Sequence, residues 1–294
     1  MKRKRLIITL IAIGATLTAA TVAFFTIRAI FASKEVDYSS MSEEELEDDH
    51  VELMNRYRSF AGDDFSKEFT SYELVNISLE KFKEHDYISS TTVGNVKSVG
   101  LDQRVRASTI KDKNNYFMEN ISYGLVKTAK RFYQKDNLIK TYDGSDIDVE
   151  TANWDEEDVE SLSLEKHEEK WGKTLNRPNI YIISSKTVLE TSKIEKRDSD
   201  YVVSLNLHPQ YSVLRYVRQM VSISPITNPV FESITLTMNL NKNLDLKSMV
   251  VDEKYTVTMI IPISSVGHIE ESYVYDSYKP IPDLKTNVEY PKYE

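Results

Sequence analysis

Near its start the chain has four basic residues, Lys2 to Arg5, followed by an uncharged apolar run from Leu6 to Ile27. A helix over that run, rising about 1.5 Å per residue, is long enough to cross a hydrocarbon core of about 30 Å. Basic residues that precede such a run remain in the cytoplasm. The pattern therefore predicts one transmembrane helix in residues 1–32, with the rest of the chain on the far side of the membrane.

The alternative for this segment is a signal peptide that is removed. Signal peptides have an apolar core of about 7–15 residues and end at a site with small side chains. The run here is longer, and cleavage after Ala32 would put Ile30 where a small side chain is needed. Cleavage after Ala23 would fall inside the apolar run. We therefore favour an uncleaved signal anchor, which makes the chain a single-pass protein of the cell membrane with an extracytoplasmic C-terminal domain.

Residues 33–64 are polar and acidic, and six acids within them are nearly contiguous: Glu43, Glu44, Glu45, Glu47, Asp48 and Asp49. A block of like charges is more typical of a solvated stalk or a surface helix than of a binding site. A helix from Ser42 to Phe60 would place several apolar residues on one side. This segment is predicted to be an acidic stalk or a membrane-proximal helix.

Residues 65–272 have the pattern of a strand-rich domain. A helix is predicted after Thr70, because Thr70 and Glu73 have the spacing of a capping box and apolar residues then recur every three or four positions. The period then changes to two. The strands predicted in this part are 96–108, 116–123, 124–134 and 138–142. The turns between them are short, which implies antiparallel neighbours.

Residues 143–179 are predicted to interrupt the sheet with an acidic stretch through Trp154 and a helix from Val159 to Trp171. Strands are predicted again at 180–190, 201–207, 234–240, 244–249 and 250–263. Between them, Pro209 suits the first turn of a helix. That helix carries an apolar stripe of Val213, Leu214, Val217 and Met220. Residues 273–294 contain three prolines and are predicted to form an extended tail.

Two segments of this layout resemble a known family. In the first, Gln103 to Gly144, short strands close on Tyr142-Asp143-Gly144. In the second, Ile234 to Val257, a strand, a polar turn and a return strand follow in order. The arrangement resembles the half-barrel of the LolA and LppX lipoprotein-carrier superfamily. The resemblance implies an α+β fold dominated by one large curved antiparallel sheet, with a few packed helices and a place in the bacterial envelope.

Charge and composition narrow the function classes. The chain has 37 basic and 46 acidic residues, but five of the basic residues and none of the acids lie in residues 1–32. The remainder therefore has a net charge of −14, which repels the phosphates of nucleic acids, so we expect no nucleic acid partner. The chain has no cysteine, which excludes disulfides, zinc thiolate sites and cysteine nucleophiles.

The sequence gives little sign of catalytic or metal chemistry. Its five histidines have no metal-binding spacing, and it has no Walker loop, GxGxxG, GxSxG or SxxK motif. Asp143, Asp146 and Asp148 could approach a cation, but their spacing is not that of an EF-hand loop, and a turn with exposed acids is the better interpretation. We expect no enzyme activity, no cofactor and no metal site.

Two functional hypotheses remain. In the first, a hydrophobic cleft between sheet and helices holds a lipid, a lipoprotein segment or another apolar ligand. Its candidate residues are Val213, Leu214, Val217, Met220, Trp154 and Trp171. In the second, the sheet has a filled interior, and the protein is a structural or signalling subunit that binds other envelope proteins. For both tryptophans, packing of the 143–179 insertion onto the sheet is the alternative role.

Overall fold

A computed structural model describes residues 42–98, 101–124, 127–171, 175–223, 228–258 and 262–290. The predicted transmembrane helix in residues 1–32 lies outside these described residues. None of the described helices combines the length and the apolar character needed to cross a membrane.

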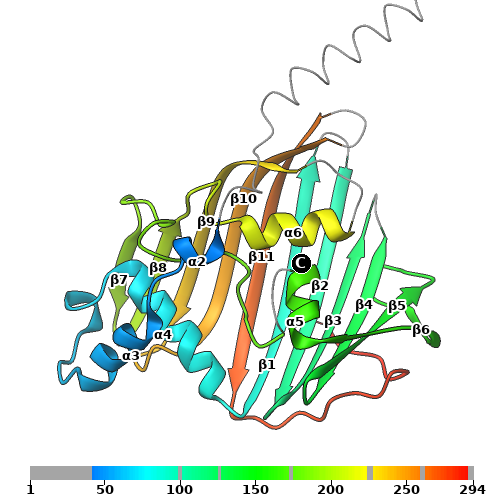
Figure 1. Ribbon diagram of the computed structural model, residues 1–294, viewed down its shortest axis with the longest axis horizontal. Coiled ribbons are helices and arrows are strands. Elements are labelled where there is room, and N and C mark those ends of the chain that lie inside the picture. Colours follow the sequence, from blue (N-terminus) through cyan, green and yellow to red (C-terminus); the bar gives the residue numbers. More distant parts are fainter. Residues whose placement is uncertain are drawn as a thin grey trace, which may run out of the picture.

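The described residues form one antiparallel sheet of eleven strands, shown in Figure 1. Its strands are β1 (Tyr87–Ser98), β2 (Leu101–Asp112), β3 (Asn115–Tyr123), β4 (Thr128–Lys135), β5 (Leu138–Ser145), β6 (Asn153–Ser163), β7 (Lys193–Arg197), β8 (Asp200–Asn206), β9 (Val230–Leu240), β10 (Leu246–Thr258) and β11 (Pro262–Tyr275). Their order across the sheet is β6-β5-β4-β3-β2-β1-β11-β10-β9-β8-β7. Neighbouring strands in the sheet are therefore consecutive in sequence, with one exception, the pair β1 and β11. The consecutive strands β6 and β7 lie at the two opposite edges of the sheet.

Tight turns explain this simple order. Two residues connect β2 to β3, β4 to β5 and β7 to β8, and the first residue of each connection has a positive φ: Lys113 at 54°, Asp136 at 54° and Asp198 at 55°. Two-residue turns of this kind match the natural twist of paired strands. They bring each strand back beside the one before it.

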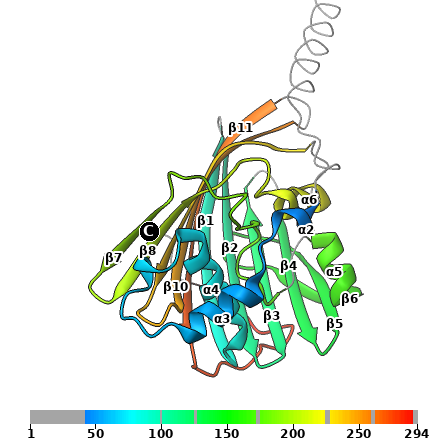
Figure 2. The ribbon, with the colours of Figure 1, turned by 60° about the vertical axis from the view of Figure 1, so that its left-hand side comes forward.

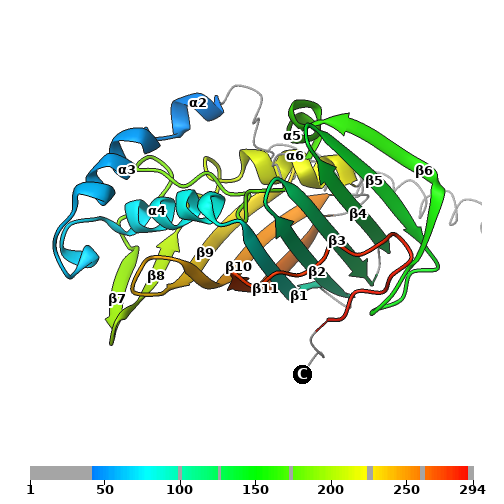
Figure 3. The same ribbon diagram turned by 90° about the horizontal axis from the view of Figure 1, so that it is seen from below.

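The sheet is strongly curved, and the helices lie on its concave side, as Figures 2 and 3 show from two directions. The helices are α2 (Glu43–Leu46), α3 (His50–Ser59), α4 (Ser71–Glu84), α5 (Leu164–Trp171) and α6 (Leu214–Ile223), with a short 3₁₀ turn η2 (Phe65–Lys67). The predicted capping box starts α4, where the Glu73 carboxylate accepts a hydrogen bond of 2.8 Å from the Thr70 backbone N–H. The fold class is confirmed: a β-dominated chain with one large antiparallel sheet and few helices.

Two apolar clusters hold the helices to the sheet. The larger joins α3 and α4 to strands β8–β10, with Leu74, Leu205 and Leu236 fully buried. The smaller lies under α5, where Trp171 packs with Phe132 and Ile139. Short side chains on the strands between the two clusters leave the concave face less filled there.

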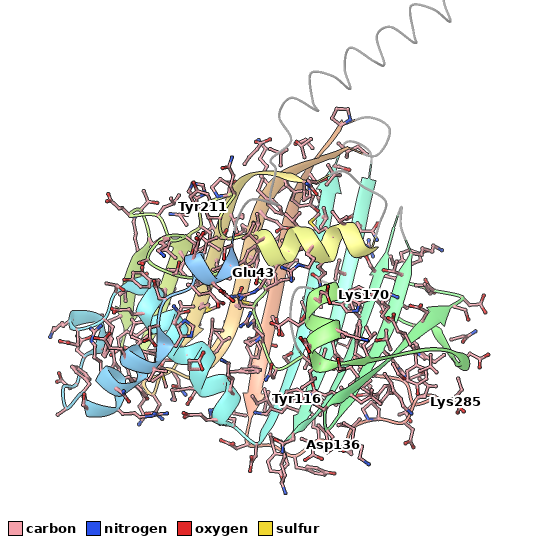
Figure 4. The ribbon with its side chains drawn as sticks, viewed as in Figure 1. Glu43, Tyr116, Asp136, Lys170, Tyr211 and Lys285 are labelled. Atoms are coloured by element: carbon pink, nitrogen blue, oxygen red, sulfur yellow. The ribbon has the colours of Figure 1, made fainter. Side chains whose placement is uncertain are left out.

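Residues 42–64, predicted to be a stalk or a membrane-proximal helix, pack against the domain in the described structure. Leu53 and Met54 of α3 belong to the larger core cluster. Glu43 of α2, labelled in Figure 4, accepts a hydrogen bond of 2.9 Å from Arg215 of α6, and Glu47 pairs with the same guanidinium. Part of the acidic block is therefore used in contacts with the domain.

The tail after β11 docks on the opposite, convex face of the sheet. Arg131 of β4 donates hydrogen bonds to the backbone carbonyls of Leu284 and Thr286, and Tyr290 donates one to Glu119 of β3. Figure 4 labels Lys285 in this part of the tail. The tail contains neither helix nor strand from residue 276 to residue 290, turns once at 284–286, and begins after Tyr275 rather than at Tyr273.

Five predicted elements are wrong in detail, and one strand was not predicted. The strand predicted at 96–108 is the hairpin of β1 and β2, with Ser98 paired to Leu101. The helix predicted at 159–171 begins only at Leu164, because residues 153–163 form the edge strand β6. Residues 180–190 form no strand beyond one bridge from Val188 to Leu207. The strands predicted at 244–249 and 250–263 are β10, and the return strand β11 was not predicted.

Candidate functional site

A cavity of about 310 Å³ lies between the two apolar clusters, on the concave face of the sheet. The sheet side of the cavity is formed by alternate residues of β1, β2 and β3, as expected for one face of a pleated sheet. These residues are Ser90, Thr92, Val96, Val105, Ala107, Thr109, Met118, Asn120 and Ser122. Most of them are short, which explains why the helices do not fill the space above them.

Longer side chains close the cavity from the other sides. Met249 and Val251 of β10 and Tyr273 of β11 form one wall, and Tyr216 and Met220 of α6 lie over it. A smaller cavity of about 70 Å³ adjoins the first and shares Met118, Asn120, Thr128, Leu175 and Gln219 with it. Without the smaller cavity, the larger one already reaches the lower end of the usual size of a small-molecule site, about 300–1,000 Å³.

The residues predicted for the cleft fall in different places. Met220 lines the main cavity, and Trp171 lines the smaller one. Val213, Leu214 and Val217 are buried within the protein and line neither cavity. The apolar stripe of α6 therefore serves mainly to hold the helix on the sheet.

Trp154 lies on the opposite face of the sheet from the cavity. Its ring stacks over the Arg131 guanidinium, 4.4 Å from ring centre to Cζ, and packs in the cluster that includes Ala129 and Tyr290 of the tail. The prediction that both tryptophans face one cleft is thus not met by the geometry. Successive side chains of a strand lie on opposite faces of the sheet, so the face of Trp154 depends on the register of β6. Because the strand β6 was not predicted, the face of Trp154 could not be predicted either.

A buried carboxyl group lies beside the cavity, behind two tyrosines that line it. Glu253 of β10 is 2% exposed and accepts hydrogen bonds from the hydroxyl groups of Tyr181, at 2.8 Å, and Tyr216, at 2.9 Å. Burial raises the pKa of Glu253 to about 7, although the two hydrogen bonds favour its charged form. The pKa of Tyr181 and that of Tyr216 are raised by burial as well.

A glycine makes room for this carboxyl group. Gly267 of β11 is paired with Glu253, and a Cβ atom at Gly267 would lie 2.8 Å from Glu253 Cγ. The close approach requires a residue without a side chain at this position. Sequence reasoning missed Glu253, although an acid among Met249, Val251 and Tyr255 on the apolar side of a strand was a visible signal.

An arginine lies where the cavity meets solvent. Arg177 lines the main cavity, and its side chain is 26% exposed. Its Nη1 atom is buried and makes no hydrogen bond within the described residues; Glu168 Oε1, at 3.9 Å, is too far for one. Burial and the nearby Arg215 lower the pKa of Arg177. Nothing in the sequence distinguished Arg177 from the other arginines.

Within the described residues, no group of three or more histidine, aspartate or glutamate side chains is arranged to hold a metal ion. In the acidic turn, Asp143 pairs with Lys130 and Asp146 accepts a hydrogen bond from Asn153 at 2.9 Å. These acids interact with neighbouring side chains of the sheet.

The sequence matches no family model and no curated protein. Among solved structures, a DUF1329 family protein from Desulfovibrio piger aligns with 70% of this chain and 92% of its own, at 12% sequence identity and a TM-score of 0.26. A score this low reflects a limited coincidence of the two backbones. The function of the site therefore has to follow from its own residues.

Proposed function

We propose that this chain is a membrane-anchored, extracytoplasmic protein of the bacterial envelope that binds an acyl chain or a lipoprotein segment. The observation that carries the proposal is the cavity of about 310 Å³ between the concave face and α6, which has several large apolar side chains in its wall. Residues 6–27 would hold the protein in the membrane, and the net charge disfavours nucleic acid as a partner. The proposal contains no catalytic step.

Binding would come from removal of apolar surface from water. Each Å² buried contributes about 25 cal/mol before the cost of ordering the ligand is subtracted. Met118, Met220 and Met249 lie in the wall. Methionine side chains adapt to ligands of irregular shape, which suits a flexible chain of methylene groups.

The alternative, a structural or signalling subunit, predicts an interior filled by the protein's own side chains. The space above Thr92 and Ala107 favours the binding function over this alternative. The protein can bind a ligand and also contact other envelope proteins. We therefore propose such contacts as a second role beside ligand binding.

The binding function can be tested with a large side chain that is introduced on the sheet and fills the cavity. Thr92 faces the cavity, whereas its neighbour Thr91 faces the other side, where its hydroxyl lies 3.1 Å from that of Ser272. We expect the full-length T92F variant to load palmitate at least about tenfold less than the wild-type chain, since its ring occupies the ligand volume. The matched T91F variant should load normally. Native mass spectrometry of the three proteins measures the bound fraction.

Equal loading of T92F and T91F would contradict the proposed site. If the wild-type chain neither carries nor accepts any acyl compound, the binding function itself is wrong.

A further inference from the structure

Arg177 lies at the solvent end of the cavity, and its surroundings leave it incompletely paired. The side chain lines both the main cavity and a small adjoining one of about 40 Å³ that also contains Arg215. The guanidinium thus lies at the boundary between the apolar interior and the surface. This is where the polar head of a ligand would come to rest if its chain entered the cavity.

The acids near Arg177 are mostly occupied by other cations. Glu43 and Glu47 pair with Arg215, and Glu43 also pairs with Arg218. Glu168, which remains for Arg177, is 42% exposed and approaches only to 3.9 Å. The exposed part of the Arg177 side chain therefore remains open to an acceptor that a ligand supplies, and hydrogen bonds between a guanidinium and an anion are strong.

The loop around Arg177 is held in place by its own hydrogen bonds. Asn179 is 3% exposed, accepts a hydrogen bond from the Tyr181 N–H at 2.9 Å and donates one to the Tyr181 carbonyl at 2.8 Å. Pro178 restricts the backbone between Arg177 and Asn179. Arg177 is therefore presented from a preorganised loop rather than from a surface helix.

We propose that Arg177 binds the anionic head of the ligand, so that the cavity takes amphiphiles with a single acyl chain and a carboxylate or phosphate group. This inference rests on the proposed function, because it assumes that the chain of the ligand lies in the cavity. The guanidinium donates hydrogen bonds to the anion, while Met118 and Met220 contact the acyl chain. Uncharged amphiphiles bind in the same cavity with lower affinity.

Photo-crosslinking in membranes that contain the full-length protein tests this inference. Three probes carry the same diazirine-labelled acyl chain: palmitic acid, palmityl alcohol and a lysophosphatidic acid. Adducts are mapped to cavity residues by peptide mass spectrometry. We expect the wild-type cavity to be labelled more strongly by at least one anionic probe than by the alcohol. Comparison of the two anionic probes distinguishes carboxylate from phosphate.

Two variants with opposite effects keep the test independent of folding. R177Q should reduce labelling by the preferred anionic probe about tenfold, the usual effect of losing a hydrogen bond to a charged group, and leave labelling by the alcohol unchanged. E168Q removes the competing carboxylate and should increase anionic labelling, which a folding defect would not do. R58Q is the matched control, because Arg58 is 61% exposed and pairs with Glu84 at 3.0 Å.

The outcomes separate the two proposals. Cavity labelling that is equal for acid, phosphate and alcohol probes and unchanged in R177Q would overturn the role of Arg177 and leave the binding function intact. Absence of cavity labelling by all three probes would overturn both.

Discussion

Glu253 is a buried acid whose described neighbours on the helix side are tyrosine hydroxyl groups rather than cations. Tyr181 and Tyr216 donate hydrogen bonds to its two carboxylate oxygens, and the Tyr255 ring lies two residues along the same strand. Burial of a carboxyl group disfavours its charged form more than two neutral donors can offset. The protein therefore holds a group in its core whose charge changes near neutral pH.

This placement makes stability depend on pH in a definite direction. The pKa of Glu253 rises from 4.5 to about 7 on folding. Between these values the folded protein keeps a proton that the unfolded chain has released. The contribution of the group to the free energy of unfolding is therefore full below pH 4.5 and is lost as the pH rises through 7.

The variant E253Q should remove this dependence. We expect its free energy of unfolding, relative to that of the wild type, to increase by on the order of a few kcal/mol between pH 4.5 and pH 8. Denaturant unfolding at a series of pH values measures the difference. Glu232 on β9 is exposed and provides the control E232Q. A constant difference between E253Q and wild type over this range would show that Glu253 does not titrate there.

At the residue scale the sequence predicted the site only in part. Met220, which belongs to the apolar stripe of its helix, lines the main cavity, and Trp171, chosen as one of two tryptophans that flank the predicted insertion, lines the smaller one. Trp154 was misplaced because a strand side chain changes face with a single residue of register. Arg177 could not be predicted as a ligand-binding residue. It is incompletely paired because Glu43 and Glu47 pair with Arg215 instead, and this arrangement exists only in the folded protein.

Helices and strands that have one apolar face were predicted at the right place in the chain, and strands without such a face were missed. Strand β9 alternates clearly and was found in place, as was helix α4. Strand β11 was missed because it has few large apolar residues. One of its faces borders the cavity and carries Glu271, and the other is exposed around His268, so neither face gives a continuous apolar pattern. Strand β6 was missed because it is an acidic edge strand without an apolar face; charged side chains on edge strands disfavour pairing with other chains.

The tail is the element whose role is most open to test. Tyr290 donates a hydrogen bond to Glu119, which is 2% exposed and also pairs with the buried Arg131. The variant Y290F should lower the free energy of unfolding by about 2 kcal/mol, because a hydrogen bond to a buried charged group is lost. Chemical denaturation of the full-length chain measures this change.

The matched control for this prediction is Y278F. Tyr278 belongs to the same tail, but it is 62% exposed, and its ring packs on that of Tyr87. Its hydroxyl should therefore contribute little. Equal stability of Y290F and Y278F would show that the hydroxyl of Tyr290 does not anchor the tail.

At the scale of the whole molecule the two faces of the sheet have different roles. The convex face between β2 and β6 is covered by the tail and contains the buried ion pair of Glu119 and Arg131, while the concave face carries the helices and the cavity. The large antiparallel sheet could be predicted from the order of short strands and tight turns. The cavity could not, because it depends on short side chains from β1 and β2 lying together between two packed clusters.

The methionines show most directly whether an acyl ligand enters this cavity. Met118, Met220 and Met249 line it. Met54 and Met238 are buried in the larger core cluster, to which Met249 also belongs, but they do not line the cavity. In a ¹³C-methyl methionine NMR titration of the full-length chain with palmitate, we expect the signals of Met118, Met220 and Met249 to shift and those of Met54 and Met238 to keep their positions. Cavity signals that stay unchanged at saturating ligand, or equal shifts of all five, would contradict binding in this cavity.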